Sequence, residues 1–230
     1  MFCCPVFIMK IMAWNVQGSK KHQIRDEIRV INQGHKPDLL FLIKTMVFDQ
    51  TTRKLIAKLG FEHYDFVNPQ NHSGGIWVLR NNASIHANVL LKENRAIHML
   101  VMDLTIQKLC VICGIYASAQ LGQKDPFWQH LADLNTIIDF PWCLIGDFNE
   151  LEDLLQKRGG SSVSTSHCRR LPQFLRTIHG SSILVQGRSF TWKKRIHGHL
   201  IYERLDRAIG RQDWLRMYAC LLYTSDAADE

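Results

Sequence analysis

The sequence lacks any apolar run that approaches the ~20 residues needed to cross a bilayer. Its apolar N-terminal segment, residues 1–9, has neither a basic region nor a small-residue cleavage site, which makes it a poor secretory signal peptide. These absences predict a protein that is intracellular, is not secreted and has no membrane partner. We expect residues 1–8 to form a short extension that precedes the first strand.

A cysteine framework is also missing. The seven cysteines are odd in number and have no regular spacing, which predicts a reducing compartment. Cys110 and Cys113 have C-x-x-C spacing, but in a strand they face opposite sides, so we interpret them as core thiols in preference to a redox or zinc pair. His197 and His199 flank Gly198 with no third ligand nearby, which favours an exposed turn over a zinc site.

No internal repeat or linker divides the 230 residues, and a composition of 46% hydrophobic and 21% charged residues is typical of a globular protein. The length suits one α/β domain. The net charge is +7, and the segment Leu151–Tyr218 carries thirteen Lys or Arg against five Asp or Glu. Such a segment would attract a polyanion, although a basic face that serves solubility has equal support from charge alone.

Hydrophobic periodicity predicts strands that alternate with amphipathic helices, in one mixed α/β unit. The expected strands are 10–16, 39–43, 76–79, 89–91, 98–104, 110–116, 141–145, 189–192 and 199–202, and an aromatic segment occupies 61–67. The expected helices are 21–32, 51–59, 126–139, 172–179 and 205–218. Asp125 is the predicted N-cap of the third helix, with Pro126 at its first helical position.

A carboxylate and an amide follow the buried strand at 141–145, in the segment Gly146-Asp147-Phe148-Asn149. The end of a strand is a common place for catalytic groups in open α/β sheets. If strand geometry continues through Phe148, the side chains of Asp147 and Asn149 project from the same side. Because Gly, Asp and Asn all favour turns, the segment taken alone is equally consistent with a simple turn.

Seven short motifs occur in an order and spacing that resemble a known family. They are Trp14–Gly18, Phe41–Thr45, Gly74–Trp77, Tyr116–Ser118, Gly146–Asn149, Phe190–Trp192 and Glu203–Arg207. Over Met9–Tyr218 the chain resembles the endonuclease/exonuclease/phosphatase family, and specifically the apurinic-type endonuclease domain of plant non-long-terminal-repeat (LINE-type) retrotransposons. Several weak motifs in the right order are much more specific than any one of them.

The resemblance implies an α/β fold, a four-layer sandwich of two mixed β-sheets flanked by helices. It also implies that Mg²⁺ (or Mn²⁺) helps water to attack a phosphodiester at one end of the sheets. Such a reaction needs a group that takes a proton from water, stabilisation of the phosphate charge, and a cation or acid for the departing oxygen.

The resemblance assigns roles to five residues. Asp147 would orient or deprotonate the water, and Asn149 would hydrogen-bond the water or a phosphate oxygen. Asn15 would lie near the metal, Tyr116 would offer its hydroxyl to the phosphate, and Asp206 would orient a histidine. Without the family, we would interpret Asn15 as a turn residue, Tyr116 as a half-buried strand residue and Asp206 as the N-terminal residue of a helix.

DNA is the expected partner, and the residues expected to contact it are Trp192, Lys193, Lys194 and Arg195. In the intact polypeptide, a reverse transcriptase domain is expected downstream, and a functional protein would act in the nucleus. The basic C-terminal half and the Trp-Asn and Phe-Thr-Trp motifs favour a polynucleotide over the inositol lipids that phosphatases of the same scaffold hydrolyse.

Two departures from the family pattern weaken the expected activity. Lys44 occupies the position of a metal-binding Glu, and an ammonium has three donors and no acceptor, so it repels Mg²⁺. The terminal Ser-Asp-His is also missing: Ala227 follows Ser225-Asp226 where the histidine is expected. We interpret residues 219–230 as a non-native tail and 9–218 as a truncated domain that lacks its C-terminal strand. An impaired metal-dependent DNA-nicking hydrolase is therefore expected, and a catalytically inactive retrotransposon relic or nucleic-acid-binding module is the alternative.

Overall fold

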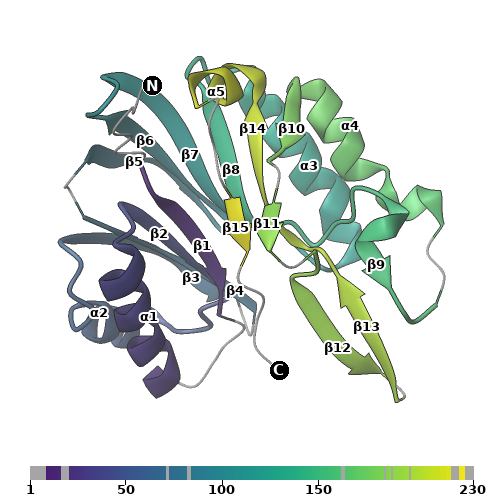
Figure 1. The fold of residues 1–230 in the computed structure, drawn as a ribbon, viewed down its shortest axis with the longest axis horizontal. Helices are drawn as coiled ribbons and strands as arrows, with labels where there is room; N and C mark the ends of the chain where they lie inside the picture. The colour runs from purple at the N-terminus through teal and green to yellow at the C-terminus, as the bar shows by residue number, and fades with distance from the viewer. Residues whose placement is uncertain are drawn as a thin grey trace, which may run out of the picture. The chain divides into compact units, whose positions relative to one another are not determined.

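The computed structural model describes residues 9–16, 21–70, 73–81, 84–161, 164–183, 185–187, 189–196, 198–218 and 223–225 (Figure 1). The chain divides into two compact units, which are Met1–Tyr116 and Ala117–Glu230. The described residues contain no helix with the length and apolar character required to cross a bilayer.

Unit 1 contains a four-stranded mixed sheet in the order β1-β2-β4-β3. Its strands are β1 (Ile11–Asn15), β2 (Leu39–Ile43), β3 (His63–Gln70) and β4 (Ser73–Arg80). β1 is parallel to β2, whereas β4 is antiparallel to both β2 and β3. The parallel pair is joined by helix α1 (Lys21–His35), and helix α2 (Asp49–Ile56) connects β2 to β3.

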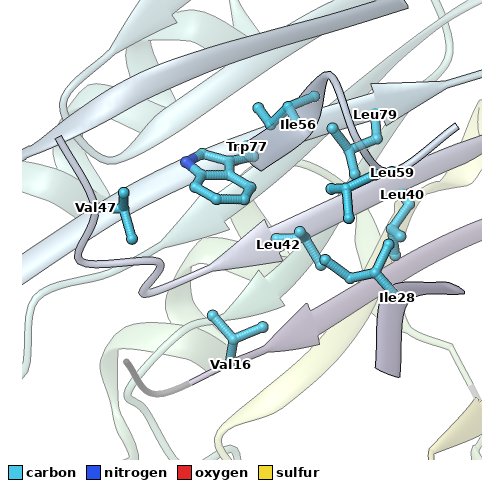
Figure 2. Packing of buried hydrophobic residues seen from close by; sticks show 9 residues of the cluster. All are labelled: Val16, Ile28, Leu40, Leu42, Val47, Ile56, Leu59, Trp77 and Leu79. Atoms are coloured by element: carbon cyan, nitrogen blue, oxygen red, sulfur yellow. The ribbon is translucent and has the colours of Figure 1, made fainter. Parts of the chain in front are cut away.

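Both helices of unit 1 cover the same face of this sheet, because one apolar cluster contains residues from all of these elements (Figure 2). Ile28 of α1 and Ile56 of α2 pack with Leu42 of β2 and Trp77 of β4. Leu42, Ile28, Ile56 and Trp77 each have at most 1% of their surface exposed. This packing holds the ends of β1 and β2 in a fixed place.

The rest of unit 1 is an antiparallel meander of β5 (Ile85–Glu93), β6 (Ala96–Asp103) and β7 (Lys108–Tyr116). Gly114 lies where β7 meets the four-stranded sheet: a Cβ atom there would be 2.1 Å from the side chain of Phe41. Only glycine permits this approach, so the meander packs face to face with β2.

Unit 2 contains three antiparallel strands, with β14 between β10 and β8. These strands are β8 (Trp142–Asp147), β10 (Gly180–Ser182) and β14 (Asp206–Arg211). The helices of the unit are α3 (Leu121–Asn135), α4 (Arg170–Thr177) and α5 (Gln212–Met217). The rings of Trp128 and Phe174, 5.0 Å apart between centroids, join α3 to α4, and Trp128 also stacks on Phe148 at 5.9 Å.

Short elements complete unit 2. β12 (Trp192–Ile196) and β13 (His199–Glu203) form a hairpin, and β13 also pairs with β9 (Lys157–Arg158) (Figure 1). The turns η1 (Leu154–Gln156) and η2 (Thr165–Cys168) flank β9. β11 (Val185–Gly187) pairs in parallel with β15 (Tyr223–Ser225), which lies within the segment interpreted as a non-native tail.

The predicted fold class is confirmed: the protein is an α/β sandwich of mixed sheets flanked by helices. The helix predicted at 205–218 is wrong, since β14 occupies Asp206–Arg211 and α5 only Gln212–Met217. Four consecutive residues of β14, from Arg207 to Gly210, are buried, as in a central strand. Asp206 therefore begins a strand, and its interpretation as a helix N-terminal residue is wrong.

The predicted start of α3 is also wrong. The helix begins at Leu121 after Gln120, so Pro126 lies inside it. The Ser118 hydroxyl fixes the entry, because it accepts a hydrogen bond from the Gln120 N–H at 3.1 Å and donates one to Gln123 Oε1 at 2.9 Å. The two predicted C-terminal strands are present and pair with each other, although the first of them starts at Trp192 instead of Ser189.

Candidate functional site

The candidate residues fall into two sets, one in each unit. Asn15, Lys44 and Tyr116 belong to unit 1, and we call their surroundings the unit 1 half-site. Asp147, Asn149 and Asp206 belong to unit 2 and define the unit 2 half-site. Gln17 and Gly18 of the first motif lie outside the described residues.

In the unit 1 half-site, two parallel strands end together. Asn15 is the last residue of β1 and is paired in register with Ile43, the last residue of β2. Lys44 follows directly, and the Val16 N–H donates to the Ile43 carbonyl at 2.9 Å. The structure therefore brings Asn15 and Lys44 to the same edge of the sheet, because parallel strands in register present their ends at one edge.

The backbone at Lys44 is held in an uncommon conformation. Lys44 has φ 58° and Met46 has φ 51°, both in the left-handed region that non-glycine residues seldom adopt. The N–H groups of Thr45 and Met46 donate to the carbonyls of Gly75 and Gly74, each at 3.2 Å. A Cβ atom on Gly75 would lie 2.5 Å from Thr45 Oγ1, so the Gly-Gly motif permits this close approach.

Two cations lie against the ring of Tyr116, the last residue of β7. Lys44 Nζ is 5.2 Å and Arg95 Cζ is 5.5 Å from the ring centroid. The Tyr116 hydroxyl is 3.0 Å from Ser73 Oγ, and Tyr116 as a whole is 5% exposed. The structure thus joins Lys44 to Tyr116. Arg95 and Ser73 were not singled out from sequence, where a lone arginine in a turn and a serine before Gly-Gly carry no distinctive pattern.

Mg²⁺ does not fit the residues of the unit 1 half-site. The residue that follows β2 at this edge is Lys44, whose ammonium has no lone pair for a metal. Across the described part of the chain, no group of three or more His, Cys, Asp or Glu side chains is arranged to hold a metal ion. The metal implied by the family motifs therefore lacks its carboxylate here.

In the unit 2 half-site, two carboxylates lie side by side. Asp147 ends β8 and Asp206 begins β14, and the two residues are direct partners in the antiparallel register. Directly opposed residues of an antiparallel pair project their side chains from the same face, with Cβ atoms ~5 Å apart. Asp147 is fully buried and Asp206 is half-buried.

Asn149 closes a tight turn after Asp147. Its N–H donates to Asp147 Oδ1 at 3.0 Å, and its Nδ2 donates to the Ala117 carbonyl at 2.7 Å. Asn149 has φ 47°, so strand geometry does not continue through Phe148. The expectation that Asp147 and Asn149 project from one side as strand residues is therefore wrong. The segment is locally a turn, as its composition allows, and the turn fixes both side chains.

Thr191, the middle residue of the Phe-Thr-Trp motif, fixes the start of β14. Its Oγ1 accepts hydrogen bonds from the N–H groups of Leu205 at 3.0 Å and Asp206 at 2.9 Å. The Phe148 N–H donates to the Leu205 carbonyl at 3.0 Å. Three motifs that are separate in sequence therefore meet at Thr191. The Phe-Thr-Trp motif contains Thr191, but the sequence does not reveal which residues its hydroxyl contacts.

A buried guanidinium joins the two chain segments that carry the unit 2 half-site. Arg207 is fully buried, and its Nη2 donates to the carbonyls of Glu150 at 2.6 Å and Arg204 at 2.5 Å. Its Nη1 donates to Glu152 Oε2 at 3.3 Å and Gln156 Oε1 at 3.2 Å. Arg207 thereby ties the chain after Asn149 to the chain before Asp206.

A second ionic group surrounds Glu150, which is 3% exposed. Lys124 Nζ lies 3.2 Å and Arg170 Nη1 3.4 Å from Glu150 Oε1. Lys124 also donates to the Asn149 carbonyl at 2.6 Å. Arg170 hydrogen-bonds Asp125 as well and thereby lowers the pKa of that carboxyl. Asp125 is therefore an ion-pair partner, and not the helix cap that the sequence predicts.

The basic residues predicted to contact DNA lie on the β12–β13 hairpin. Lys193, Lys194 and Arg195 are exposed, whereas Trp192 is half-buried and packs against a small cluster that includes Leu205. At the tip, Gly198 has φ 81° and His199 is exposed, which agrees with the exposed-turn interpretation. His197 lies outside the described residues.

Cys110 and Cys113 form no disulfide and are fully buried, which confirms them as core residues. Cys113 Sγ is 2.7 Å from His98 Nδ1, and His98 Nε2 is 3.0 Å from Glu93 Oε2. Burial lowers the pKa of His98, but Cys113 and Glu93 outweigh that effect and raise the pKa to about 10. Sequence analysis did not single out His98, whose two partners come from neighbouring strands.

Comparison with protein-family models and with curated proteins found no match. Solved structures do match. The endonuclease domain of TRAS1, a telomere-specific non-LTR retrotransposon, has a TM-score of 0.67 at 11% identity, over 91% of this chain and 88% of that one. The AP endonuclease LMAP from Leishmania major has a TM-score of 0.68 at 15% identity, over 91% and 80%.

The 3' phosphatase NExo from Neisseria, solved with a product DNA hairpin, has a TM-score of 0.64 at 14% identity, covering 89% of this chain and 87% of that one. At such identities the similarity concerns the fold. The likeness spans nine-tenths of the chain and is shared by a retrotransposon endonuclease domain, an AP endonuclease and a nuclease-type phosphatase. The chain therefore has the fold of endonuclease/exonuclease/phosphatase proteins, in agreement with the family that its sequence motifs resemble.

Proposed function

We propose that this chain is a phosphodiester hydrolase that acts on DNA, of the retrotransposon endonuclease kind, and that Lys44 weakens its cleavage. The observation that carries the proposal is the pairing of Asp147 with Asp206 across β8 and β14. Asp147 is held by a hydrogen bond that it accepts from the Asn149 N–H. Asp206 is held by a hydrogen bond that its own N–H donates to Thr191 Oγ1. Two carboxylates fixed side by side are suited to orienting water and a basic partner.

Each residue of the half-sites has a chemical role in this proposal. Asp147 orients the attacking water or takes its proton. Since Asn149 Nδ2 donates to the Ala117 carbonyl, its Oδ1 is the atom that would accept a hydrogen bond from water. Tyr116 offers a hydroxyl to the phosphate, and Asp206 orients a histidine. In related enzymes, a divalent metal would supply charge stabilisation, which the residues around Lys44 do not support.

DNA is the proposed substrate because three exposed cations project from the β12–β13 hairpin. Lys193, Lys194 and Arg195 would contact phosphates, while Trp192 anchors the strand that carries them. The solved neighbours add support, since one is a retrotransposon endonuclease domain and another was solved with a DNA hairpin. In an intact element, such a nick would prime reverse transcription in the nucleus. Genomic sequence encoding Ser-Asp-His and then a reverse transcriptase after Tyr218 would support this context.

The test is nicking of supercoiled plasmid in the presence of Mg²⁺. We expect weak nicking that EDTA and Asp147→Ala abolish, with Asp139→Ala, an exposed carboxylate in the same unit, as the control. On a chain joined to an intact terminal Ser-Asp-His segment, Lys44→Glu should raise the nicking rate by at least about tenfold. The reason is that it restores a carboxylate at the position where the family pattern has a metal-binding Glu. No nicking by either chain would contradict the hydrolase proposal.

The second candidate function is DNA binding without cleavage. The observation that favours it is the ammonium of Lys44 against the Tyr116 ring, at the position where the family pattern has a metal-binding carboxylate. Binding of DNA with no nicking, in both the unchanged chain and Lys44→Glu, would support this function over hydrolysis.

A further inference from the structure

The unit 1 half-site gathers an ammonium, a guanidinium and two hydroxyls around one aromatic ring. Lys44 Nζ and Arg95 Cζ lie 5.2 Å and 5.5 Å from the Tyr116 centroid, within the range of cation–π contacts. The Tyr116 and Ser73 hydroxyls are 3.0 Å apart. The two cations come from different turns, one after β2 and one between β5 and β6. Only the tertiary fold brings them together.

The framework of this cluster is rigid. The Lys44 turn is held by backbone hydrogen bonds from Thr45 to Gly75 and from Met46 to Gly74. The Tyr116 N–H donates to the Arg95 carbonyl at 2.9 Å, which ties the second turn to the strand that carries the ring. Gly74 lies against the ring, since a Cβ atom there would be 3.6 Å from it. The backbone that carries the donors is therefore already ordered before binding, which lowers the entropy cost of binding.

We propose that this cluster is a phosphate-binding site that binds a nucleic-acid backbone without a metal ion. Its members are Lys44, Arg95, Ser73 and Tyr116. Guanidinium and ammonium groups are the side chains best suited to phosphate oxygens, the first as a planar fork and the second as a point charge. The hydroxyls of Ser73 and Tyr116 hydrogen-bond each other, so one of the two would donate to the same oxyanion. The inference rests on the proposed polynucleotide ligand, but not on cleavage.

The burial of Tyr116 specifies which part of a nucleic acid is bound. Tyr116 as a whole is 5% exposed and its ring contacts the two cations, so the ring offers little surface on which a base could stack. Recognition at this site is therefore electrostatic and independent of sequence, as expected for backbone contacts. Mg²⁺ would compete with Lys44 for the phosphate, so added Mg²⁺ should weaken binding, the reverse of what a metal-bridged site would show.

The test measures binding of a fluorescently labelled DNA duplex of about 20 base pairs to the full chain. Binding is followed by fluorescence anisotropy, in EDTA and over a range of salt concentrations. We expect Lys44→Met and Arg95→Gln each to weaken binding about tenfold and to reduce the salt slope by about 1, the change expected for one lost phosphate contact. Lys54→Met, an exposed lysine on α2 of the same unit, is the control and should change neither quantity. Lys44→Arg keeps the charge and should retain binding.

Three outcomes would overturn the proposal. The first is Lys44→Met and Arg95→Gln binding as tightly as Lys54→Met, with the same salt slope. The second is binding by the unchanged chain that requires Mg²⁺. The third is Lys44-dependent binding of inorganic phosphate with no affinity for the duplex, which would assign the site to a free anion. Circular dichroism verifies folding, and Arg95→Gln tests the site independently if Lys44→Met fails to fold.

Failure of the site and failure of the hydrolase proposal can be distinguished. Binding in EDTA that depends on Lys44, together with absence of nicking even in Lys44→Glu, would support the phosphate site and refute hydrolysis. The opposite result is Mg²⁺-dependent nicking by the unchanged chain, together with DNA binding in EDTA that does not depend on Lys44 or Arg95. It would support hydrolysis and refute the phosphate site.

Discussion

The two half-sites differ in the sign of their charge and in how that charge is held. The unit 2 half-site presents the carboxylates of Asp147 and Asp206, fixed through backbone hydrogen bonds and a strand register. The unit 1 half-site presents Lys44 and Arg95 against an aromatic ring. The carboxylates and the cations are thus built on separate elements, so a substitution can reverse the charge of one half-site without disturbing the other.

Each unit also contains a buried polar side chain, and the two differ in their hydrogen-bond partners. Arg207 in unit 2 is satisfied mostly by backbone and side-chain oxygens and ties two loops together. His98 in unit 1 is satisfied by a thiol and a carboxylate on neighbouring strands. The first group is permanently charged and the second titrates, so the stability of the two units should respond differently to mutation and to pH.

The largest effect is expected from Arg207→Met. The change keeps much of the side-chain volume but leaves the carbonyls of Glu150 and Arg204 without their donor, so the free energy of unfolding should fall by about 3 kcal/mol. Urea denaturation followed by circular dichroism measures the loss. Arg195→Met on the exposed hairpin is the matched control and should change the value by less than about 0.5 kcal/mol. Equal effects of the two substitutions would contradict the role assigned to Arg207.

The next effect concerns pH and the unit 1 network. The pKa of His98 in the folded protein is about 10, above the ordinary value of 6.5, so protonation favours folding. Its contribution to stability is fully present below pH 6.5 and is lost as the pH rises through 10.

The measurement is urea unfolding from pH 6 to pH 10.5 for the unchanged chain and for His98→Gln. The difference between their unfolding free energies should shrink across this window, whereas His86→Gln, an exposed histidine on β5, should follow the unchanged chain. A difference that stays constant with pH would show that His98 does not titrate in this way.

Gly75→Ala tests the rigidity of the Lys44 turn. Gly75 has φ 82°, and the new Cβ atom would lie 2.5 Å from Thr45 Oγ1, so we expect a loss of about 2 kcal/mol in unfolding free energy. Gly34→Ala in α1 is the contrasting variant, because nothing lies within 4 Å of the added atom. It should stabilise the protein by about 0.5 to 1 kcal/mol. Thermal unfolding of both variants measures the contrast, and a neutral Gly75→Ala would contradict the tight turn.

The smallest effect is expected from Thr191→Val in unit 2. The variant preserves shape but removes the oxygen that accepts hydrogen bonds from Leu205 and Asp206, which should cost about 1 to 2 kcal/mol. Hydrogen exchange should accelerate at these two amides, and Thr191→Ser should restore protection. Thr177→Val, at an exposed hydroxyl on α4, serves as the control. Unchanged exchange at Leu205 and Asp206 would refute the role of Thr191.

Local sequence patterns predicted most of the strands and helices. The apolar run at Leu39–Ile43 matches β2 residue for residue, and the helical spacing after Lys21 predicted α1. The failures lie where local preference and tertiary contacts disagree. Pro126 suggested a helix start, but Ser118 fixes the start five residues earlier, at Leu121. The segment after Leu205 suggested a helix, but its first half becomes the central strand β14.

The candidate residues were identified by the order of their motifs, and the register of β8 with β14 places two of them side by side. The roles of Thr191, Arg207 and Arg95 were not predicted, because each depends on partners distant in sequence: Thr191 on Asp206, Arg207 on Glu150, and Arg95 on Tyr116. A motif records which residues are present, whereas hydrogen-bond partners depend on how strands are paired.

The sequence by itself determined the α/β class and the basic C-terminal region, since local periodicity and composition encode these features directly. The motif order, through the family that it resembles, identified Lys44 as standing in place of an expected carboxylate. Only the tertiary structure decided that Lys44 and Arg95 share one aromatic ring and that Asp147 faces Asp206. The physical reason is that strand register and face-to-face packing set distances between residues that are remote along the chain, and local patterns carry no information on those distances.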